Sequence, residues 1–162
     1  MLILNSGGTF NKRYNYLNGE LEVPYDNAAL KRILESTGTL YEVAGVIYKD
    51  SLDMDINDRK ILARVIMESN EDTFVIVHGT DTMHLSAEFL AEIFDDRKIV
   101  LVGAMKPFEV DNIEASLNLG MAIGFAKGVS QNGVYICMNG YVEQWNKIVK
   151  NTKFGKFELV QE

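Results

Sequence analysis

FVIVHGTDTM (Phe74–Met83) decides the fold, because a short apolar run leads directly into glycine, threonine and aspartate. A second stretch, LILNSGGTF (Leu2–Phe10), also passes from apolar residues to glycine and then threonine. This order is typical of a buried strand that ends in a loop rich in accessible backbone amides. Ligands of open α/β sheets bind beyond the carboxyl ends of strands, so both threonines are predicted to face one crevice. Two hydroxyls among glycine amides indicate a nucleophile with donors for an oxyanion.

Length and composition indicate one soluble domain. The chain has 162 residues, is 47% hydrophobic and carries a formal net charge of −7. We expect neither nucleic acid nor an anionic membrane as a partner, because both attract a surplus of Lys and Arg. Met1–Leu4 leads into a strand without the basic segment of a secretory signal, and no apolar run approaches the roughly 20 residues of a membrane span. The single cysteine, Cys137, lies in an apolar run and is predicted to be a buried thiol, which fits a cytoplasmic location.

Strand-like runs alternate with helical patterns, which predicts a doubly wound α/β fold with a mainly parallel sheet and right-handed crossovers. The expected strands are Leu2–Asn5, Tyr41–Tyr48, Thr73–His78, Ile99–Gly103 and Val134–Met138. The expected helices are Asp26–Leu34, Asn57–Ser69, Thr82–Phe94 and Asp111–Lys127, the first capped by Asp26 and the last ended by a left-handed Gly128. The apolar helix positions are Ile61, Leu62, Val65 and Ile66 in the second helix and Leu85, Phe89, Leu90 and Ile93 in the third. Phe154–Val160 fits either a short edge strand or a strap.

Tyr14–Val23 departs from this alternation. Asn18-Gly19 stands between strand-like flanks, which is a strong signal for a β-hairpin with a tight turn. The hairpin follows Thr9 closely and is predicted to cover the crevice as a lid. An isolated two-stranded ribbon is marginally stable in water, so we expect the lid to open and close.

Hydroxyl groups, carboxylates and lysines follow the other expected strands as well. The second strand is followed by KDSLDM (Lys49–Met54), the fourth by GAMK (Gly103–Lys106), and the fifth by Asn139-Gly140 and a loop to Lys150. The carboxyl ends of parallel strands lie at one edge of the sheet, so these groups are expected to converge there.

Together these motifs resemble those of the bacterial-type L-asparaginase family. That family is similar in having GGT after its first strand, a serine-containing DM segment after its second, HGTDTM after its third and VGAM[KR]P after its fourth. This chain shows GGTF, DSLDM, HGTDTM and VGAMKP in the same order, over almost its whole length. The resemblance implies an asparaginase N-terminal-domain-like fold and an amidohydrolase that converts L-asparagine and water to L-aspartate and ammonia through a threonyl acyl-enzyme. It implies no cofactor, and the sequence has neither a metal-ligand cluster nor a GxGxxG after its first strand.

The resemblance also implies a role for individual residues. Thr9 would be the primary nucleophile, activated by a tyrosine of the following mobile segment, for which Tyr14 is preferred over Tyr16 and Tyr25. The second catalytic cluster and the substrate-binding residues are taken over from the motifs in the same way. The cluster is Thr80, Asp81 and Lys150, in which a neutral Lys150 amine draws a proton from Thr80 or its water. The binding residues are Ser51 for the substrate's α-carboxylate, Asp81 for its α-amino group, and the backbone of Gly8 and Gly79.

Some of these residues also fit purely structural roles. The GGT segment could be ordinary turn chemistry, and Asp81 could simply cap the helix that follows. Asp53 is expected to support the Ser51 loop rather than contact substrate, and Lys106 could be a solvated lysine. His78 is predicted to be a hydrogen-bonded structural residue rather than a general base.

Two departures from the family pattern affect the expected activity. Full-length members carry a second, smaller domain after this one, so we expect residues 1–162 to be a single catalytic domain without the C-terminal asparaginase domain. Leu52 stands where many relatives have Gln or Ser, which removes one hydrogen bond to the substrate's α-carboxylate. We therefore expect a high substrate requirement, weak activity on glutamine, and closure of the site by self-association into a homodimer or homotetramer.

Two other functions remain open from sequence. One is a catalytically weak module of the same fold that binds amino acids. The other is the amidase partner of a tRNA-dependent amidotransferase, which is disfavoured because those subunits carry extra domains for assembly and this chain opens directly on its first strand.

Overall fold

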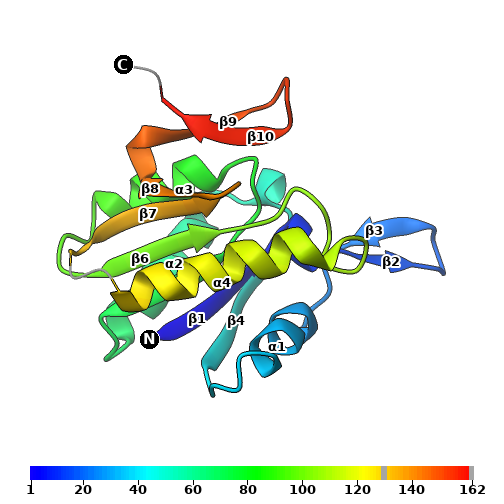
Figure 1. Cartoon of the computed structure of the whole chain (residues 1–162), viewed down its shortest axis with the longest axis horizontal. Helices are drawn as coiled ribbons and strands as arrows, with labels where there is room; N and C mark the ends of the chain where they lie inside the picture. Colours follow the sequence, from blue (N-terminus) through cyan, green and yellow to red (C-terminus); the bar gives the residue numbers. More distant parts are fainter. Residues whose placement is uncertain (129–130, 161–162) are drawn as a thin grey trace.

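The computed structural model describes residues 1–128 and 131–160, and a six-stranded sheet forms its centre (Figure 1). The first five strands in spatial order are parallel and the sixth, β8, runs antiparallel, so the predicted mainly parallel sheet is confirmed. The spatial order is β4 (Glu42–Lys49), β1 (Leu2–Gly7), β5 (Thr73–Val77), β6 (Lys98–Val102), β7 (Gly133–Met138) and β8 (Tyr141–Gln144).

Helices cover both faces of this sheet. Helices α1 (Ala28–Glu35) and α4 (Asn112–Gly128) pack on one face, and α2 (Ile56–Glu68) and α3 (Met83–Ala91) pack on the other (Figure 1). Successive strand residues point to opposite faces, so neighbouring side chains of one strand enter different cores. The core under α1 and α4 includes Ile3, Val75, Leu30 and Leu119, and the core under α2 and α3 includes Leu4, Ile76, Leu62 and Leu90.

The helix ends follow local capping chemistry. Asp55 caps α2 through a capping box in which its side chain accepts from Asp58 N and the Asp58 side chain accepts from Asp55 N. The N-cap position of α1 is Asn27 and not the predicted Asp26, although Asp26 Oδ1 accepts from Ala28 N at 2.9 Å. The prediction for Gly128 is wrong, because this residue lies within α4 and its φ is outside the left-handed region.

The buried stripe of each helix is narrower than the apolar pattern suggests. Leu62, Ile66 and Leu90 are buried, but Ile61 and Leu85 are each more than 40% exposed, as is Ile93, which lies beyond the end of α3 although it was predicted to be helical. A sheet covers only one side of a helix, so apolar side chains at the margin of the stripe stay in contact with solvent.

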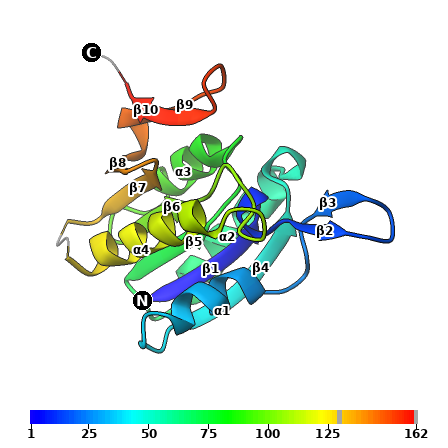
Figure 2. The ribbon, with the colours of Figure 1, turned by 45° about the vertical axis from the view of Figure 1, so that its right-hand side comes forward.

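Two small antiparallel ribbons extend from this body. The predicted hairpin is present as β2 (Arg13–Asn15) and β3 (Glu20–Glu22), and it projects away from the sheet (Figures 1 and 2). Its loop spans residues 16–19 rather than Asn18-Gly19 alone, because Asn15 pairs with Glu20 and Gly19 N donates to Asn15 O at 2.8 Å. Gly19 has a φ of 77° there, a conformation that glycine adopts easily.

The C-terminal ribbon consists of β9 (Ile148–Asn151) and β10 (Lys156–Leu159). The segment Phe154–Val160 therefore contributes a strand, but this strand pairs with β9 and not with the edge of the central sheet. Lys150 lies on β9, so the expected loop from Asn139 to Lys150 is wrong: β8 and β9 occupy most of it.

The strand order places the site. The chain crosses from β1 to β4 on one side and then returns to β5 on the other side of β1. The carboxyl ends of β1 and β5 therefore lie at a topological switch point, where open α/β sheets form a ligand-binding crevice. Thr9 follows β1 and Thr80 follows β5, so both threonine motifs begin at this crevice.

Candidate active site

Glycines let the four motif loops touch one another. A methyl group added at Gly8 would lie 2.4 Å from the Cα of Gly79, and one added at Gly79 would lie 2.6 Å from Ser51 Oγ. One added at Gly103 would lie 2.6 Å from His78 O. Any side chain at these positions would push the loops apart, so glycine is required for the backbones to approach this closely. The contact between Gly8 and Gly79 brings the residues that follow them, Thr9 and Thr80, to the same place.

Buried asparagines hold the turn that carries Thr9. Asn5 Oδ1 accepts from Gly7 N at 3.0 Å, and Asn11 Nδ2 donates to Gly7 O at 2.7 Å and to Asn5 Oδ1 at 2.9 Å. Gly8 N donates to Lys49 O at 2.8 Å, which ties the same turn to the end of β4. Asn5 and Asn11 were not predicted to act here. They could have been found from the sequence, because two asparagines flank the Gly-Gly-Thr turn and asparagine side chains often bond backbone groups in turns.

Thr80, Asp81 and Lys150 are in direct contact. Lys150 Nζ donates to Thr80 Oγ1 at 2.8 Å and forms an ion pair with Asp81 Oδ1 at 2.7 Å. Thr80 is 3% exposed and the Lys150 side chain 12%, although 70 residues separate them in sequence. The Asp81 carboxylate faces Lys150, and α3 begins without a side-chain cap, so the alternative that Asp81 caps this helix is not what the structure shows.

Ser51 is buried in a short 3₁₀ helix (Ser51–Asp53) that contacts the loop containing Thr80. Thr82 Oγ1 donates to Ser51 O at 2.7 Å, and Thr82 N donates to Ser51 Oγ at 3.4 Å. Asp50 caps this segment through its Oδ1, which accepts from Leu52 N at 3.1 Å, and Asp53 N donates to Asp50 O at 3.0 Å. That the Asp53 side chain supports the segment stays a prediction. Leu52 itself is 70% exposed.

A further ion pair joins the loops that follow β1 and β4. Lys12 Nζ lies 2.5 Å from Asp50 Oδ2, which connects the turn after Thr9 with the residue before Ser51. Burial opposes ionisation of Asp50, but the hydrogen bonds from Lys12 and from Leu52 N outweigh it and hold the pKa of this carboxyl below its usual range.

His78 is a structural residue, as predicted. It is fully buried, its Nδ1 lies 2.8 Å from Gly79 O, and its Nε2 lies 2.8 Å from Ser86 Oγ. Burial lowers the pKa of His78 to about 4, so the ring is neutral at physiological pH.

Tyr14 is not brought to Thr9. It lies on β2, is 59% exposed, and its hydroxyl is 3.8 Å from where a side chain of Gly19 would begin, so it points along the hairpin toward its loop. Tyr14 N donates to Glu109 Oε2 at 2.9 Å, which holds the hairpin base to the segment after β6. The hairpin stands open in this structure (Figure 2), and the role of Tyr14 stays a prediction.

The other candidate groups have ordinary surroundings. Lys106 is exposed and pairs with Asp111 at 2.9 Å, which raises the pKa of its amine, and Cys137 is a core thiol whose pKa burial raises to about 12. Within residues 1–128 and 131–160, no three His, Cys, Asp or Glu side chains are placed to hold a metal ion. The same residues include no helix with the length and apolar character needed to cross a membrane.

A family model described as "Asparaginase, N-terminal" matches residues 1–158. The chain belongs to the asparaginase family. This membership confirms the resemblance carried by the four motifs.

The relatives of this chain are named either as amidotransferase subunits or as asparaginases. A glutamyl-tRNA(Gln) amidotransferase subunit of Methanococcus maripaludis strain C5 is 30% identical over 144 residues, which are 85% of this chain and 34% of that protein. Glutaminase-asparaginase of Acinetobacter glutaminasificans is 30% identical over 87% of this chain and 45% of that protein. L-asparaginase 2 of Escherichia coli is 30% identical over 89% of this chain and 42% of that protein. The chain thus spans between a third and a half of the length of these relatives.

Solved asparaginase structures share the fold. The thermostable L-asparaginase from Thermococcus kodakarensis superposes with a TM-score of 0.84 at 23% identity, over 98% of this chain and 50% of that one. A probable cytoplasmic L-asparaginase from Campylobacter jejuni gives 0.77 at 24% identity, over 98% and 52%. The asparaginase N-terminal-domain fold expected from sequence is therefore confirmed.

Proposed function

We propose that the chain is an amidohydrolase that converts L-asparagine and water to L-aspartate and ammonia. The observation that carries this proposal is the contact of Lys150 with both Thr80 and Asp81 in a crevice beside Thr9. Family membership supports amide hydrolysis in general, and the choice of asparagine rests on the motif residues.

Thr9 acts as the nucleophile in this proposal. Its Oγ forms a bond to the side-chain amide carbon, the carbon–nitrogen bond breaks, and the hydroxyl proton leaves with the amine as ammonia. Water then attacks the ester, its oxygen stays on aspartate, and a proton returns to Thr9 Oγ. In this proposal the developing oxyanion accepts from backbone N–H groups of the loops that contain Gly8 and Gly79, other than Gly8 N, which donates to Lys49 O.

Thr80, Asp81 and Lys150 move the protons. Lys150 Nζ lies 2.8 Å from Thr80 Oγ1, so in this proposal it relays a proton between Thr80, or a water beside it, and the reacting groups. The Asp81 carboxylate orients the amine from the other side.

Substrate orientation falls to Ser51 for the α-carboxylate and Asp81 for the α-amino group. The Asp81 side chain is 38% exposed, which leaves part of its carboxylate accessible to an amino group in addition to Lys150. Leu52 offers no polar side chain beside Ser51, so the substrate requirement is high and glutamine is a weak substrate.

A second candidate function is that of the amidase subunit in a tRNA-dependent amidotransferase. The relatives named as glutamyl-tRNA(Gln) amidotransferase subunits favour it, as they match with about the same identity as those named asparaginase. It uses the same threonine chemistry, but ammonia release then depends on a partner protein.

Ammonia release by the purified chain tests the proposal, with asparagine and glutamine in parallel and binding measured by calorimetry. We expect release from asparagine by the chain alone and much less from glutamine. Release that requires a partner would favour the amidotransferase subunit, and binding without release would favour a catalytically weak amino-acid-binding module of the same fold.

A further inference from the structure

Arg59 lies on α2 beneath two of the motif loops, although no motif contains it. It is 8% exposed, its Nε donates to Ser86 Oγ at 3.1 Å, and its Nη1 donates to Met54 O at 3.5 Å. Ser86 leads through His78 to the Thr80 loop, and Met54 closes the segment that begins at Ser51. We infer that Arg59 is a positioning residue that fixes the Ser51 segment and the Thr80 loop relative to each other, an inference that rests on the proposed function.

Only one assignment of donors and acceptors satisfies the hydrogen bonds that lead from Arg59 to the Thr80 loop. Gly79 O can only accept, so His78 Nδ1 carries the ring proton and Nε2 of the neutral ring accepts from the Ser86 hydroxyl. Ser86 Oγ is then left to accept from Arg59 Nε. The chain of donors therefore runs from Arg59 through Ser86 and His78 to the carbonyl of Gly79, and it fixes the peptide plane that joins Gly79 to Thr80.

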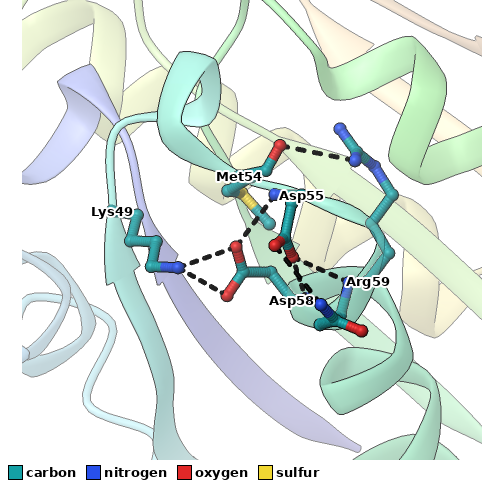
Figure 3. A network of polar contacts seen from close by, with 6 residues as sticks. Lys49, Met54, Asp55, Asp58 and Arg59 are labelled. Carbon is teal, nitrogen blue, oxygen red and sulfur yellow. Dashed lines mark hydrogen bonds and ion pairs between the residues drawn. The ribbon is translucent and has the colours of Figure 1, made fainter.

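The hydrogen bonds toward Ser51 fasten the other loop to the same helix (Figure 3). Lys49, which precedes the segment, reaches both carboxylate oxygens of Asp58 at 2.9 Å. At the far end Asp55 N donates to Asp58 Oδ2 at 2.9 Å, and Met54 O accepts from Arg59. The Ser51 segment is thus held at both ends by the first turn of α2.

Stability alone gives no reason for a guanidinium at this position. Arg59 Nη2 is buried and has no hydrogen-bond partner among the described residues. A buried donor left without a partner costs the free energy of its desolvation, so this nitrogen lowers the stability of the fold. The geometry instead gives Arg59 two loops to hold, and a displacement of about 1 Å at a reacting group can lower turnover by up to about a hundredfold.

The two connections of Arg59 can be cut separately. Arg59→Met removes both, so we expect kcat on asparagine to fall at least about tenfold and KM to rise several-fold. Ser86→Ala cuts only the branch to Thr80, so kcat should fall by a similar factor while KM stays within about twofold. Arg64→Met is the matched control, because Arg64 is exposed on the same helix, and this variant should keep both constants.

Hydrogen–deuterium exchange provides a readout that does not need activity. Arg59→Met should speed backbone exchange in residues 51–54 and in residues 79–82, and Ser86→Ala only in residues 79–82. If the wild-type chain releases no ammonia, the proposed function fails and these exchange patterns still decide the inference. If Arg59→Met does not fold, judged by its melting temperature, Arg59→Lys and Ser86→Ala take its place.

The inference would be overturned if Arg59→Met and Ser86→Ala both kept the kcat, KM and hydrogen-exchange rates of the wild-type chain. An equal rise of KM in the two variants would overturn the part that concerns the Ser51 segment.

Discussion

The two threonines differ in what surrounds their hydroxyls. Thr80 Oγ1 accepts from Lys150, whereas the hydroxyl of Thr9 has no hydrogen-bond partner among the described residues. A hydroxyl held by a lysine suits a proton relay, whereas the hydroxyl of Thr9 needs a base to be brought to it before it can act as the nucleophile.

Replacing either threonine tests this division. We expect Thr9→Ala and Thr80→Ala each to lower asparagine hydrolysis by at least about two orders of magnitude, the usual effect of losing a catalytic group. The free energy of unfolding should change little in Thr9→Ala, whereas Thr80→Ala loses the buried hydrogen bond from Lys150 and should be less stable by about 1 kcal/mol. Steady-state ammonia release and urea unfolding measure the two effects, and near wild-type turnover in either variant would show that its threonine is structural.

Burial of His78 makes stability depend on pH. Its pKa is about 4 in the folded protein, below the ordinary value of 6.5, so between these values the unfolded chain binds a proton that the folded chain does not. The stabilisation is fully present above pH 6.5 and is lost as the pH falls toward 4, by on the order of 3 kcal/mol.

Urea unfolding at pH 7 and pH 4.5 measures this loss. His78→Asn should remove most of the decrease, since Asn has a donor for Gly79 O but no titrating ring. His84→Gln is the control, because His84 is exposed, and it should leave the decrease intact. An unchanged decrease in the His78 variant would refute the assignment.

Residue chemistry was predictable where a motif carries it. Thr80, Asp81 and Lys150 were predicted to cluster, and the structure brings them within hydrogen-bond distance. Asn5, Asn11 and Arg59 were not predicted, because they act through buried hydrogen bonds whose partners only the folded chain brings together.

At the scale of elements, the hairpin is the part whose position is most open to change. It projects from the body (Figure 2), and Tyr14, Tyr16 and Leu17 on it are largely exposed. We propose that it closes over the crevice and carries Tyr14 toward Thr9, since a two-stranded ribbon cannot bury its own apolar surface.

Two matched substitutions test the lid. Tyr14→Phe keeps the ring and removes the hydroxyl, so we expect a large fall in kcat with little change in binding, while Tyr16→Phe should have a much smaller effect. Stopped-flow turnover and calorimetry separate the two quantities. Equal losses from the two variants, or no loss from Tyr14→Phe, would show that another residue activates Thr9.

The main strands and helices were predictable because their periodicity is local. The strand at Thr73–Val77 and the helix at Ile56–Glu68 agree with the predicted elements to within one residue at each end. A strand within Phe154–Val160 was one of two alternatives left open, but its pairing with β9 was not predicted, because it depends on tertiary contacts that the local sequence pattern does not encode. Phe157 of β10 is buried and its N donates to Asn139 Oδ1 at 2.8 Å. Lys150 pairs with Phe157 in this ribbon, so the position of a site residue depended on an element that was not predicted.

At the scale of the whole molecule, apolar surface remains exposed. Tyr16, Leu17, Tyr25 and Leu40 are each more than 80% exposed, and β4 forms one edge of the central sheet. Exposed apolar groups and a free sheet edge favour association, and closing the crevice strengthens electrostatic contacts to substrate.

We expect a dimer, or a dimer of dimers, in solution. Light scattering coupled to gel filtration at working concentration measures the mass, and activity should fall on dilution below the dissociation constant of the dimer. A monomer with full activity would contradict this expectation.

The partition of asparagine turnover between water and hydroxylamine tests the threonyl acyl-enzyme most directly. Ammonia, aspartate and β-aspartyl hydroxamate are measured together while hydroxylamine is increased. We expect the ammonia released to equal the sum of the two products, with hydroxamate growing at the expense of aspartate, because both nucleophiles compete for one ester on Thr9. Ammonia release with aspartate as the sole product at every hydroxylamine concentration, or no ammonia at all, would contradict it.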